Sequence, residues 1–388
     1  MAASRLSRLE FLIPSIIVLF LALDAAARFC RLEPLAFRGD EALFQFRSPS
    51  LPGPFEPNRS YRNDRIHGDL SNSSNQPRYD VFRPQIFSTD SLGFRNPPDQ
   101  SGSPPDVLMI GSSFTAGSGV TDSDTLPAQV QSLSGCRVFN AGYLNFAIRI
   151  LSPSDLAKRC GMNKGLIVLE CLDRGVGEMI QPPPIHHPPR SFDFLRDAYR
   201  YGLDRWPKSP LDVLCKRTYK ALQNDWILPN VYKHLAPARQ LIDGQIMLFS
   251  QDLEKPRNVE GIPRNVEYYS RLRDELHSEG FELAFVIVPD KISVYGDLLR
   301  EPVSARADCT AAMAELERRL RSRGIPVVNL APILTAEARR ALKTGETLYW
   351  RDDTHWNPKG ILVSAQAICD AFNLRDRCRG DRGGDHSP

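Results

Sequence analysis

Val107-Leu-Met-Ile-Gly-Ser-Ser-Phe-Thr-Ala-Gly117 is the stretch that decides the fold. Its four apolar residues end abruptly at Gly111, Ser112 and Ser113, which indicates a buried strand followed by a tight turn into a helix. A serine in such a turn presents its hydroxyl above the edge of a sheet, and the glycines let a reacting group approach the backbone. Ser113 is therefore a candidate nucleophile, provided that the chain also supplies a base.

Strand-like and helix-like segments alternate from about residue 105 onward. Continuous apolar strands separated by helices are typical of a parallel sheet covered on both faces. We therefore predict a three-layer α/β/α sandwich with a mainly parallel, five-stranded sheet. The expected strands are 106–110, 137–140, 165–171, 281–288 and 325–330. Helices are expected at 125–133 and 360–372, and from a cap at Ser152 or Ser154 to Arg159. Two more helices are expected, one that ends near Gly280 and one that contains Met313 and Leu320.

Composition divides the 388 residues into further parts. Residues 31–104 are rich in Pro, Asn, Ser and Arg, which predicts an extended linker and an N-terminal arm. Within the α/β domain of residues 105–375, the Pro-rich stretch 178–262 breaks the alternation and is expected to be an insertion over one edge of the sheet. The charged residues 376–388 are expected to form a disordered tail.

The first 30 residues carry an export signal of one of two kinds. Arg5 and Arg8 precede an apolar run from Phe11 to Leu23, as in a signal anchor that holds the chain at the inner membrane. Ala25-Ala26-Ala27 instead satisfies the cleavage site of a signal peptide, which would make the chain secreted. We favour the anchor. Both alternatives place the rest of the chain on the extracytoplasmic, periplasmic side.

Charge and cysteine content exclude several classes of protein. The net charge of +3 is small, and no Lys/Arg cluster alternates with aromatic residues, so we expect no nucleic-acid partner. No cysteines or histidines have the spacing of a zinc site, and we expect neither a metal nor a cofactor. An exported chain can form disulfides, with Cys136–Cys160 and Cys369–Cys378 as possible pairs, although sequence alone does not give the connectivity.

The candidate base is His355, in Tyr349-Trp-Arg-Asp-Asp-Thr-His-Trp-Asn357. A serine hydroxyl becomes nucleophilic when an imidazole takes its proton, and a carboxylate must orient that imidazole. Asp352 and Asp353 are both close enough in sequence to serve. Because ligands bind beyond the carboxyl ends of parallel strands, other residues that follow predicted strands are expected at the same edge. They are Gly142, Glu170 to Arg174 and Pro289 to Tyr295.

Three of these motifs resemble one known family. Gly111-Ser-Ser-Phe114 resembles the Gly-Asp-Ser-Phe/Leu block of the SGNH (GDSL) hydrolases, and Asn140-Ala-Gly142 is similar to their second block. Asp353-Thr-His-Trp356, with Pro289-Asp-Lys291 and Val294-Tyr295, resembles the branch related to the alginate O-acetyltransferases of the AlgX/AlgJ type. The resemblance implies an enzyme that transfers or hydrolyses O-acyl groups, most readily O-acetyl groups, on a cell-surface polysaccharide; it does not identify the acyl donor.

The resemblance also implies roles for individual residues. Ser113 would be the nucleophile, His355 the general base and acid, and Asp353 or Asp352 the orienting carboxylate. The N–H groups of Ser113 and Gly142 would form the oxyanion hole. Substrate contacts are expected from four residues, Arg174, Lys291, Tyr295 and Trp356. For three of them an alternative stays open: a surface ion pair with Asp173 or Glu170 for Arg174, a solvated side chain for Lys291 and buried packing for Trp356.

Two departures from the family pattern matter. Ser112 replaces the usual aspartate of the first block, and we expect this to weaken the support of the loop. The Gly-x-Asn-Asp block after the third strand is missing, and Glu170-Cys-Leu-Asp-Arg174 stands there instead. The asparagine of that block supplies an oxyanion donor, and the resemblance implies that Arg174 either replaces it or binds substrate. The absence of the block also motivates a second hypothesis, a catalytically inactive SGNH-fold protein that binds or scaffolds a polysaccharide.

Overall fold

The computed structural model describes residues 2–29, 38–44, 52–97, 104–143, 152–178, 232–251, 257, 259–301 and 306–380, together with a few single positions between 211 and 222. Most of the insertion predicted at 178–262 lies outside these residues.

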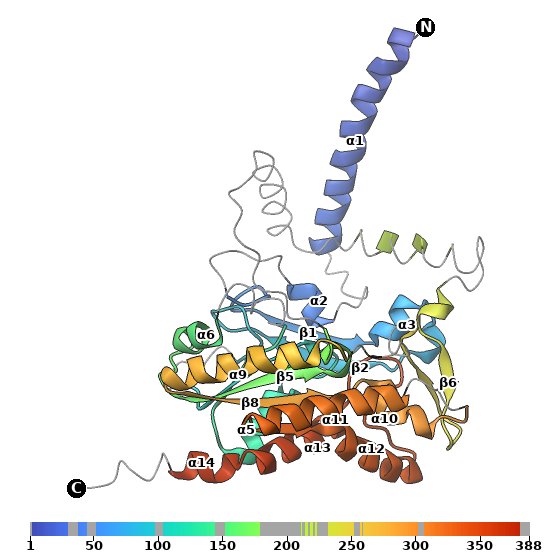
Figure 1. Ribbon diagram of the computed structural model, residues 1–388. Coiled ribbons are helices and arrows are strands. Elements are labelled where there is room, and N and C mark those ends of the chain that lie inside the picture. The colour runs from blue at the N-terminus through green and yellow to red at the C-terminus, as the bar shows by residue number, and fades with distance from the viewer. Residues whose placement is uncertain are drawn as a thin grey trace.

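A five-stranded parallel sheet forms the centre of the molecule (Figure 1). Every neighbouring pair in it is parallel, which confirms the predicted sheet. Its order is β4-β3-β5-β8-β9, with β3 at Val107–Ile110, β4 at Val138–Ala141, β5 at Gly165–Leu172, β8 at Phe281–Val288 and β9 at Val327–Asn329.

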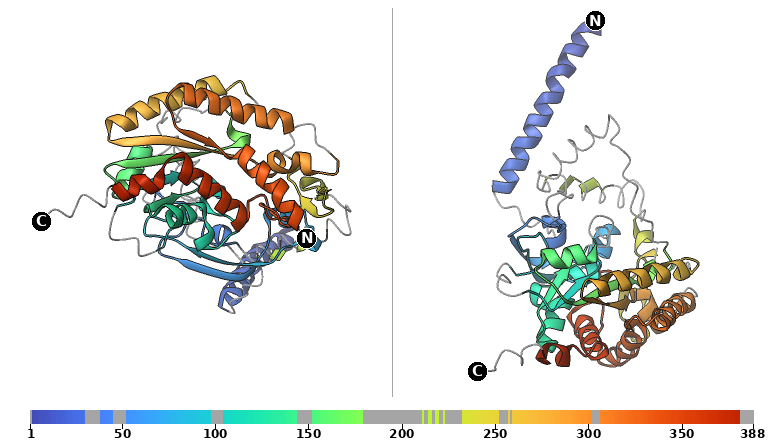
Figure 2. Two further views of the ribbon diagram at one scale, coloured as in Figure 1. Left: turned by 90° about the horizontal axis from the view of Figure 1, so that it is seen from below. Right: turned by 60° about the vertical axis from the view of Figure 1, so that its left-hand side comes forward.

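Helices cover both faces of this sheet (Figure 2). Leu108 and Ile110 of β3 belong to one buried core, while Val107 and Met109 belong to the other, as the alternation of side chains along a strand requires. The first core contains residues of α6 (Pro153–Arg159), α9 (Ile262–Ser278) and α11 (Arg306–Ser322). The second contains residues of α4 (Ser113–Ala116), α5 (Leu126–Ser134), α10 (Lys291–Tyr295), α12 (Leu330–Ala341), α13 (Pro358–Ala371) and α14 (Leu374–Gly380).

The strand order determines where a ligand can bind. Along the chain, β3 is the first strand of this sheet. β4 follows on one side of it, and β5, β8 and β9 then follow on the other side. The order therefore reverses between β3 and β5. In doubly wound sheets this switch point opens a crevice beyond the carboxyl ends of the strands. Ser113 follows β3 directly, so the sequence motif lies at the carboxyl end of a strand at this switch point.

The described residues of the N-terminal arm, 38–44 and 52–97, are folded, whereas an extended linker was predicted over residues 31–104. It contains α2 (Gly39–Leu43), α3 (Asp69–Ser73) and an antiparallel pair of strands, β1 (Ser60–Ile66) and β2 (Arg83–Ser88). Leu43, Phe55 and Phe87 form a small core of its own. These apolar residues are too far apart in sequence to give a periodic signal, and therefore composition alone suggested a linker.

The C-terminal segment also differs from the prediction. Residues 374–380 form α14, so the tail expected from residue 376 does not start there; residues 381–388 lie outside the described part. Cys378 on α14 forms a disulfide with Cys136, which precedes β4. The two pairs suggested from sequence are therefore wrong, and Cys160 and Cys369 are free thiols. Nearness along the chain did not indicate which cysteines meet in space.

Further elements were not predicted, among them α10, α12 and a β-hairpin. α12 follows β9 directly, and its Pro332 lies in the first turn, where a helix tolerates proline. The described part of the insertion includes an antiparallel hairpin of β6 (Ala238–Gln240) and β7 (Ile246–Leu248).

The first residues form a helix, α1 (Ala2–Phe29), which projects away from the sandwich in Figure 1. Among the residues that the structure describes, no helix has both the length and the apolar character needed to cross a bilayer. The membrane anchor over residues 1–30 is not confirmed and stays a prediction.

The Cys136–Cys378 disulfide should stabilise the fold, since it closes a loop of 242 residues. We expect Cys378→Ser to lower the free energy of unfolding by about 2–5 kcal/mol, as measured by urea denaturation under oxidising conditions. Cys215→Ser, at an exposed free cysteine, is the matched control and should leave stability unchanged. Equal stability of both variants and the wild type would show that the disulfide contributes nothing.

Candidate active site

Ser113 is the first residue of the short helix α4. Ser112 caps this helix, because its hydroxyl accepts a hydrogen bond from the N–H of Phe114 at 3.1 Å. Gly111 is required here, since a Cβ at this position would collide with the side chains of Thr115 and Glu170. The turn thus fixes where the Ser113 hydroxyl leaves the edge of the sheet.

Glu170 supports this turn from the neighbouring strand β5. Its buried carboxylate accepts hydrogen bonds from the N–H groups of Ser112 (3.3 Å) and Thr115 (2.9 Å), and from the hydroxyls of both residues. Burial raises the pKa of Glu170, and these hydrogen bonds oppose the rise. The expectation that Ser112 weakens the loop is therefore wrong, because Ser112 and Glu170 together support it.

His355 connects the serine to a carboxylate. Its Nε2 lies 2.7 Å from Ser113 Oγ, and its Nδ1 lies 2.7 Å from Asp353 Oδ1. The same carboxylate oxygen accepts the backbone N–H of His355 at 3.0 Å, which holds the loop and the ring in one orientation. Three groups from the two ends of the α/β domain therefore form one continuous hydrogen-bonded line.

The two neighbouring aspartates have different partners. Asp353 contacts the imidazole, whereas Asp352 Oδ2 accepts the N–H groups of Gly68 (2.7 Å) and Val81 (2.9 Å) in the arm. Gly68 is a necessary glycine, because a Cβ there would overlap the backbone of Asp352. The geometry assigns the contact with His355 to Asp353 and the attachment of the arm to Asp352.

Two buried arginines of the arm hold the second oxygen of Asp353. Arg38 Nη1 lies 2.7 Å and Arg83 Nη2 lies 2.6 Å from Asp353 Oδ2, and Arg83 also contacts Asp352 at 3.1 Å. Burial opposes ionisation of Asp353, but Arg38, His355 and Arg83 outweigh it and hold its pKa well below the usual value. Sequence reasoning missed both arginines, since single arginines in a polar stretch carry no pattern.

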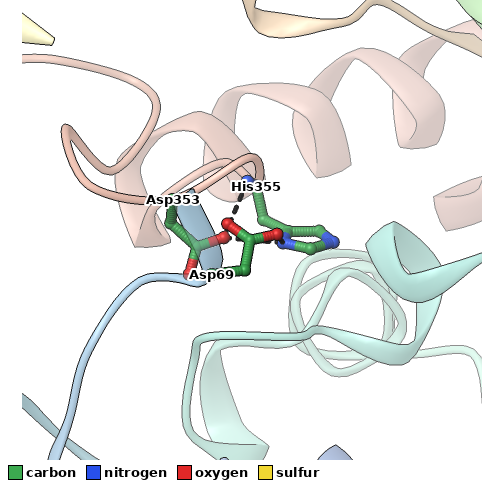
Figure 3. Close-up of side chains that lie close together, drawn as sticks. All are labelled: Asp69, Asp353 and His355. Atoms are coloured by element: carbon green, nitrogen blue, oxygen red, sulfur yellow. Dashed lines mark hydrogen bonds and ion pairs between the residues drawn. The ribbon is translucent and has the colours of Figure 1, made fainter. Parts of the chain in front are cut away.

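Asp69 of α3 lies beside the same pair of side chains (Figure 3). Its Oδ2 is 3.9 Å from His355 Nδ1, and its Oδ1 accepts the N–H of Thr354 at 2.7 Å. Burial and the nearby Asp353 raise the pKa of Asp69. The three side chains are close enough to hold a metal ion by spacing, but the guanidinium groups of Arg38 and Arg83 disfavour a cation at this position.

Gly142 lies near Ala116 of α4, but its N–H is already engaged. It donates to Asn140 Oδ1 at 3.0 Å, within the turn that follows β4. Ser113 N–H, in contrast, has no partner within its own helix, as is usual in a first turn, and no hydrogen bond from it to another described residue is present. Of the two expected oxyanion donors, only Ser113 N–H is available in this structure.

The remaining predicted substrate contacts are mostly buried. Lys291 is fully buried and donates to the carbonyls of Leu248 (2.9 Å) and Trp350 (2.7 Å), and burial lowers its pKa to about 8. Neither alternative for Lys291 fits, because it is neither solvated nor free to hold a sugar. The buried hydroxyl of Tyr295 accepts the N–H of Leu348 at 2.7 Å, and the ring of buried Trp356 packs against that of Phe114, 5.2 Å between centroids.

Arg174 is the exception, with a side chain that is 39% exposed. It lies in a turn of 3-10 helix that follows β5, and its Nη1 is 3.4 Å from Asp290 Oδ1. The ion pair expected with Asp173 or Glu170 is thus made with Asp290 instead, a buried carboxyl whose pKa burial raises to about 6. Since Asp290 follows β8, Arg174 lies at the edge of the sheet where ligands bind.

Comparison with known proteins finds a family match for the C-terminal part of the chain. Residues 247–383 match the family described as SGNH hydrolase-like domain, acetyltransferase AlgX, a range that includes Asp353 and His355 but not Ser113. A Pseudomonas putida (strain KT2440) protein named "Probable alginate O-acetylase AlgJ" is 30% identical over 138 residues, which are 34% of this chain and 34% of that protein. The Pseudomonas fluorescens protein of the same name is 28% identical over 120 residues, 31% of this chain and 28% of that one.

The "Alginate biosynthesis protein AlgX" of Pseudomonas putida is 29% identical over 114 residues, 29% of this chain and 24% of that protein. The chain thus matches about a third or less of the length of these relatives. A solved structure assigned to the G-D-S-L family, from Desulfitobacterium hafniense DCB-2, covers 68% of this chain and 98% of its own at 11% identity, with a TM-score of only 0.33. Residues 247–383 are thus similar to the AlgX/AlgJ-type branch of the SGNH hydrolases, and the relatives that the chain resembles carry names of the same branch.

Proposed function

We propose that the protein is a serine-dependent acyl-transfer enzyme that adds O-acetyl groups to a cell-surface polysaccharide, or removes them, outside the cytoplasm. The observation that carries this proposal is the line from Ser113 Oγ through His355 to Asp353, with 2.7 Å at both hydrogen bonds. A membrane tether through α1 and a periplasmic location are part of the same proposal, based on the apolar N-terminal segment.

The geometry supports a two-step reaction through an acyl-enzyme. As Ser113 Oγ attacks the acyl carbonyl, His355 Nε2 takes its proton, and Asp353 stabilises the imidazolium that forms. The tetrahedral intermediate then releases the donor's alcohol or thiol, which leaves with the proton from His355. In the second step a sugar hydroxyl gives its proton to His355 and attacks the acyl-enzyme, and Ser113 regains a proton when the ester of the sugar is released. Water in place of the sugar makes the protein an esterase.

The arm contributes electrostatically to this reaction. Asp353 must stay ionised to orient and stabilise the imidazole, yet it is fully buried, and an isolated buried carboxylate tends to be neutral. Arg38 and Arg83 compensate for the lost hydration and keep it charged. In this proposal the arm is therefore part of the active site, and the α/β domain without it would lack a functional acid.

The polysaccharide substrate is inferred from the relatives. Two of them are named as alginate O-acetylases and one as an alginate biosynthesis protein. The family match over residues 247–383 contains the loop with Asp353 and His355, and the stretches matched by the relatives cover only part of each of those proteins. We therefore propose a polysaccharide acceptor and O-acetyl chemistry as the class of reaction, and leave the polymer and the acyl donor open.

A catalytically inactive, polysaccharide-binding protein is the alternative function. It is favoured by the engaged N–H of Gly142 and by the missing asparagine block after β5, which together leave few oxyanion donors. The two functions differ in one measurable property, the formation of an acyl-enzyme on Ser113.

Intact-mass spectrometry of the purified full-length protein with p-nitrophenyl acetate tests the proposal. We expect the wild type to release nitrophenol in a burst and to gain one acetyl group, whereas Ser113→Ala and His355→Ala should do neither, because each lacks the nucleophile or its base. If all three folded proteins behave alike, Ser113 is not the nucleophile, and binding of polysaccharides becomes the function to pursue.

Asp353→Asn and Asp352→Asn should differ in their effects on kcat and on thermal stability. Asp353→Asn should lower kcat by up to about 10⁴-fold with little loss of fold, because an amide cannot keep the imidazole in its working tautomer. Asp352→Asn should lower thermal stability, since its carboxylate holds the arm, while the folded fraction keeps most of its kcat. The opposite pattern would make Asp352 the acid of the triad.

The charge of Arg83 should matter for stability, because its removal leaves two buried carboxylates short of a partner. We expect Arg83→Met to lower the free energy of unfolding by about 3–5 kcal/mol in urea denaturation. Arg62→Met on the same pair of strands is the control, since Arg62 pairs with Asp64 at the surface and its loss should cost less than about 1 kcal/mol. A similar loss of unfolding free energy in both variants would mean that the buried ion pairs of Arg83 stabilise the fold no more than a surface pair does.

A further inference from the structure

Tyr143 has a backbone conformation that residues other than glycine rarely adopt. It directly follows Gly142, and its φ angle of 64° lies in the left-handed region. Such a conformation costs free energy and persists only where the surrounding structure enforces it. Because Tyr143 lies one residue past the turn that approaches α4, the contacts that enforce this conformation bear on the nucleophile turn.

The arm enforces this conformation through the phenol. Tyr143 OH donates to Asp40 Oδ2 at 2.6 Å, and its ring packs edge-on against that of Phe55, 5.6 Å between centroids. Burial and Asp40 raise the pKa of Tyr143 well above its usual value, so the phenol keeps the proton that it donates. Although burial acts to raise it, the pKa of Asp40 is held below its usual value by Arg38 and by the hydroxyls of Ser118 and Tyr143.

The backbone of Tyr143 in turn contacts the nucleophile turn. Its N–H donates to the carbonyl oxygen of Ser112 at 3.2 Å. That carbonyl belongs to the same peptide group as Ser113 N–H, and in a trans peptide the two point in opposite directions. The same carbonyl accepts the N–H of Ala116 at 3.0 Å, so the hydrogen bond from Tyr143 is the second of two that set the direction of Ser113 N–H. This N–H is the expected oxyanion donor and has no acceptor among the described residues.

The same arm residues also reach the other end of the triad. Arg38 Nη2 donates to Ser118 Oγ at 2.6 Å, and this hydroxyl donates to Asp40 Oδ2 at 2.6 Å. Arg38 Nη1 holds Asp353. One buried network thus runs from Asp353 through Arg38 and Asp40 to Tyr143, and from there to the peptide of Ser113.

We infer that Asp40 and Tyr143 are positioning residues, which hold the peptide group of Ser112 and Ser113 so that Ser113 N–H points at the oxyanion of the acyl-transfer intermediate. The inference rests on the proposed function. Neither side chain has to touch the substrate: Asp40 holds the phenol, the phenol holds the strained backbone of Tyr143, and this backbone holds the peptide. Their effect should therefore appear in the transition state and not in substrate binding.

The test compares kcat and KM for p-nitrophenyl acetate in the full-length protein and in Tyr143→Phe and Asp40→Asn. Both variants keep the size of the side chain and lose the hydrogen bond or weaken it. We expect kcat to fall about tenfold to a hundredfold with KM within about twofold of the wild type. Inhibition by phenylboronic acid, which forms a tetrahedral adduct with a serine hydroxyl, should weaken by a similar factor, since the adduct needs the same donor.

Tyr61→Phe is the matched control, because Tyr61 packs against the same small core of the arm but its hydroxyl accepts from Asn63. It should keep the wild-type kcat and the wild-type sensitivity to the boronic acid. A purely structural role of Tyr143 would instead lower thermal stability without the parallel change in kcat and boronic acid inhibition. If Tyr143→Phe does not fold, Asp40→Asn alone decides the outcome.

Ser113→Ala, measured in parallel, separates the two ways in which the inference can fail. If the wild type is no faster than Ser113→Ala, the proposed function is wrong and the inference falls with it. If the wild type is faster, but folded Tyr143→Phe and Asp40→Asn match it in kcat and in boronic acid inhibition, the proposed function stands and only the positioning role is overturned.

Discussion

The contact of Asp353 with Arg38 and Arg83 is the interaction on which the rest of the site depends. All three side chains are buried, and Asp353 has one oxygen on His355 and the other on the two guanidinium groups. A buried carboxylate without such partners would be costly, and so would two buried arginines without a carboxylate. The arm and the loop that contains His355 are therefore stable only together, which ties formation of the site to docking of the arm.

The parallel sheet provides the other half of the site. Its order reverses between β3 and β5, and the nucleophile turn follows the first of these strands while Glu170 of the second supports it. The sheet thus positions the candidate nucleophile, and the arm positions the candidate acid. His355, in the loop before α13, lies between these two structures and contacts both.

Features that depend on neighbouring residues in the sequence could be predicted, and features that join distant residues could not. The five strands and most of the helices that cover them were predicted, because buried parallel strands are continuous apolar runs and the turn at Gly111 interrupts one sharply. The proximity of Ser113 to His355 was inferred from motifs that follow strand ends. The sequence leaves Asp352 and Asp353 equivalent, since two adjacent side chains of a tight loop point in different directions only in the folded protein.

The features that escaped prediction all join distant parts of the chain. Arg38 and Asp353 are 315 residues apart, and Cys136 and Cys378 are 242 apart, so no local pattern relates them. The small core of Leu43, Phe55 and Phe87 likewise has no periodicity. A polar, Pro-rich composition describes a segment that lacks a large core of its own, but it does not exclude a segment that folds against another domain.

The most direct test of the account is to locate and time the covalent labelling of the protein by a fluorophosphonate, which reacts with activated serines. Peptide mapping should find the label on Ser113, and labelling should become at least about tenfold slower when Arg38 and Arg83 are both replaced by methionine in protein that is still folded. A label on another serine, or equal rates with and without the two arginines, would contradict a triad that depends on the arm.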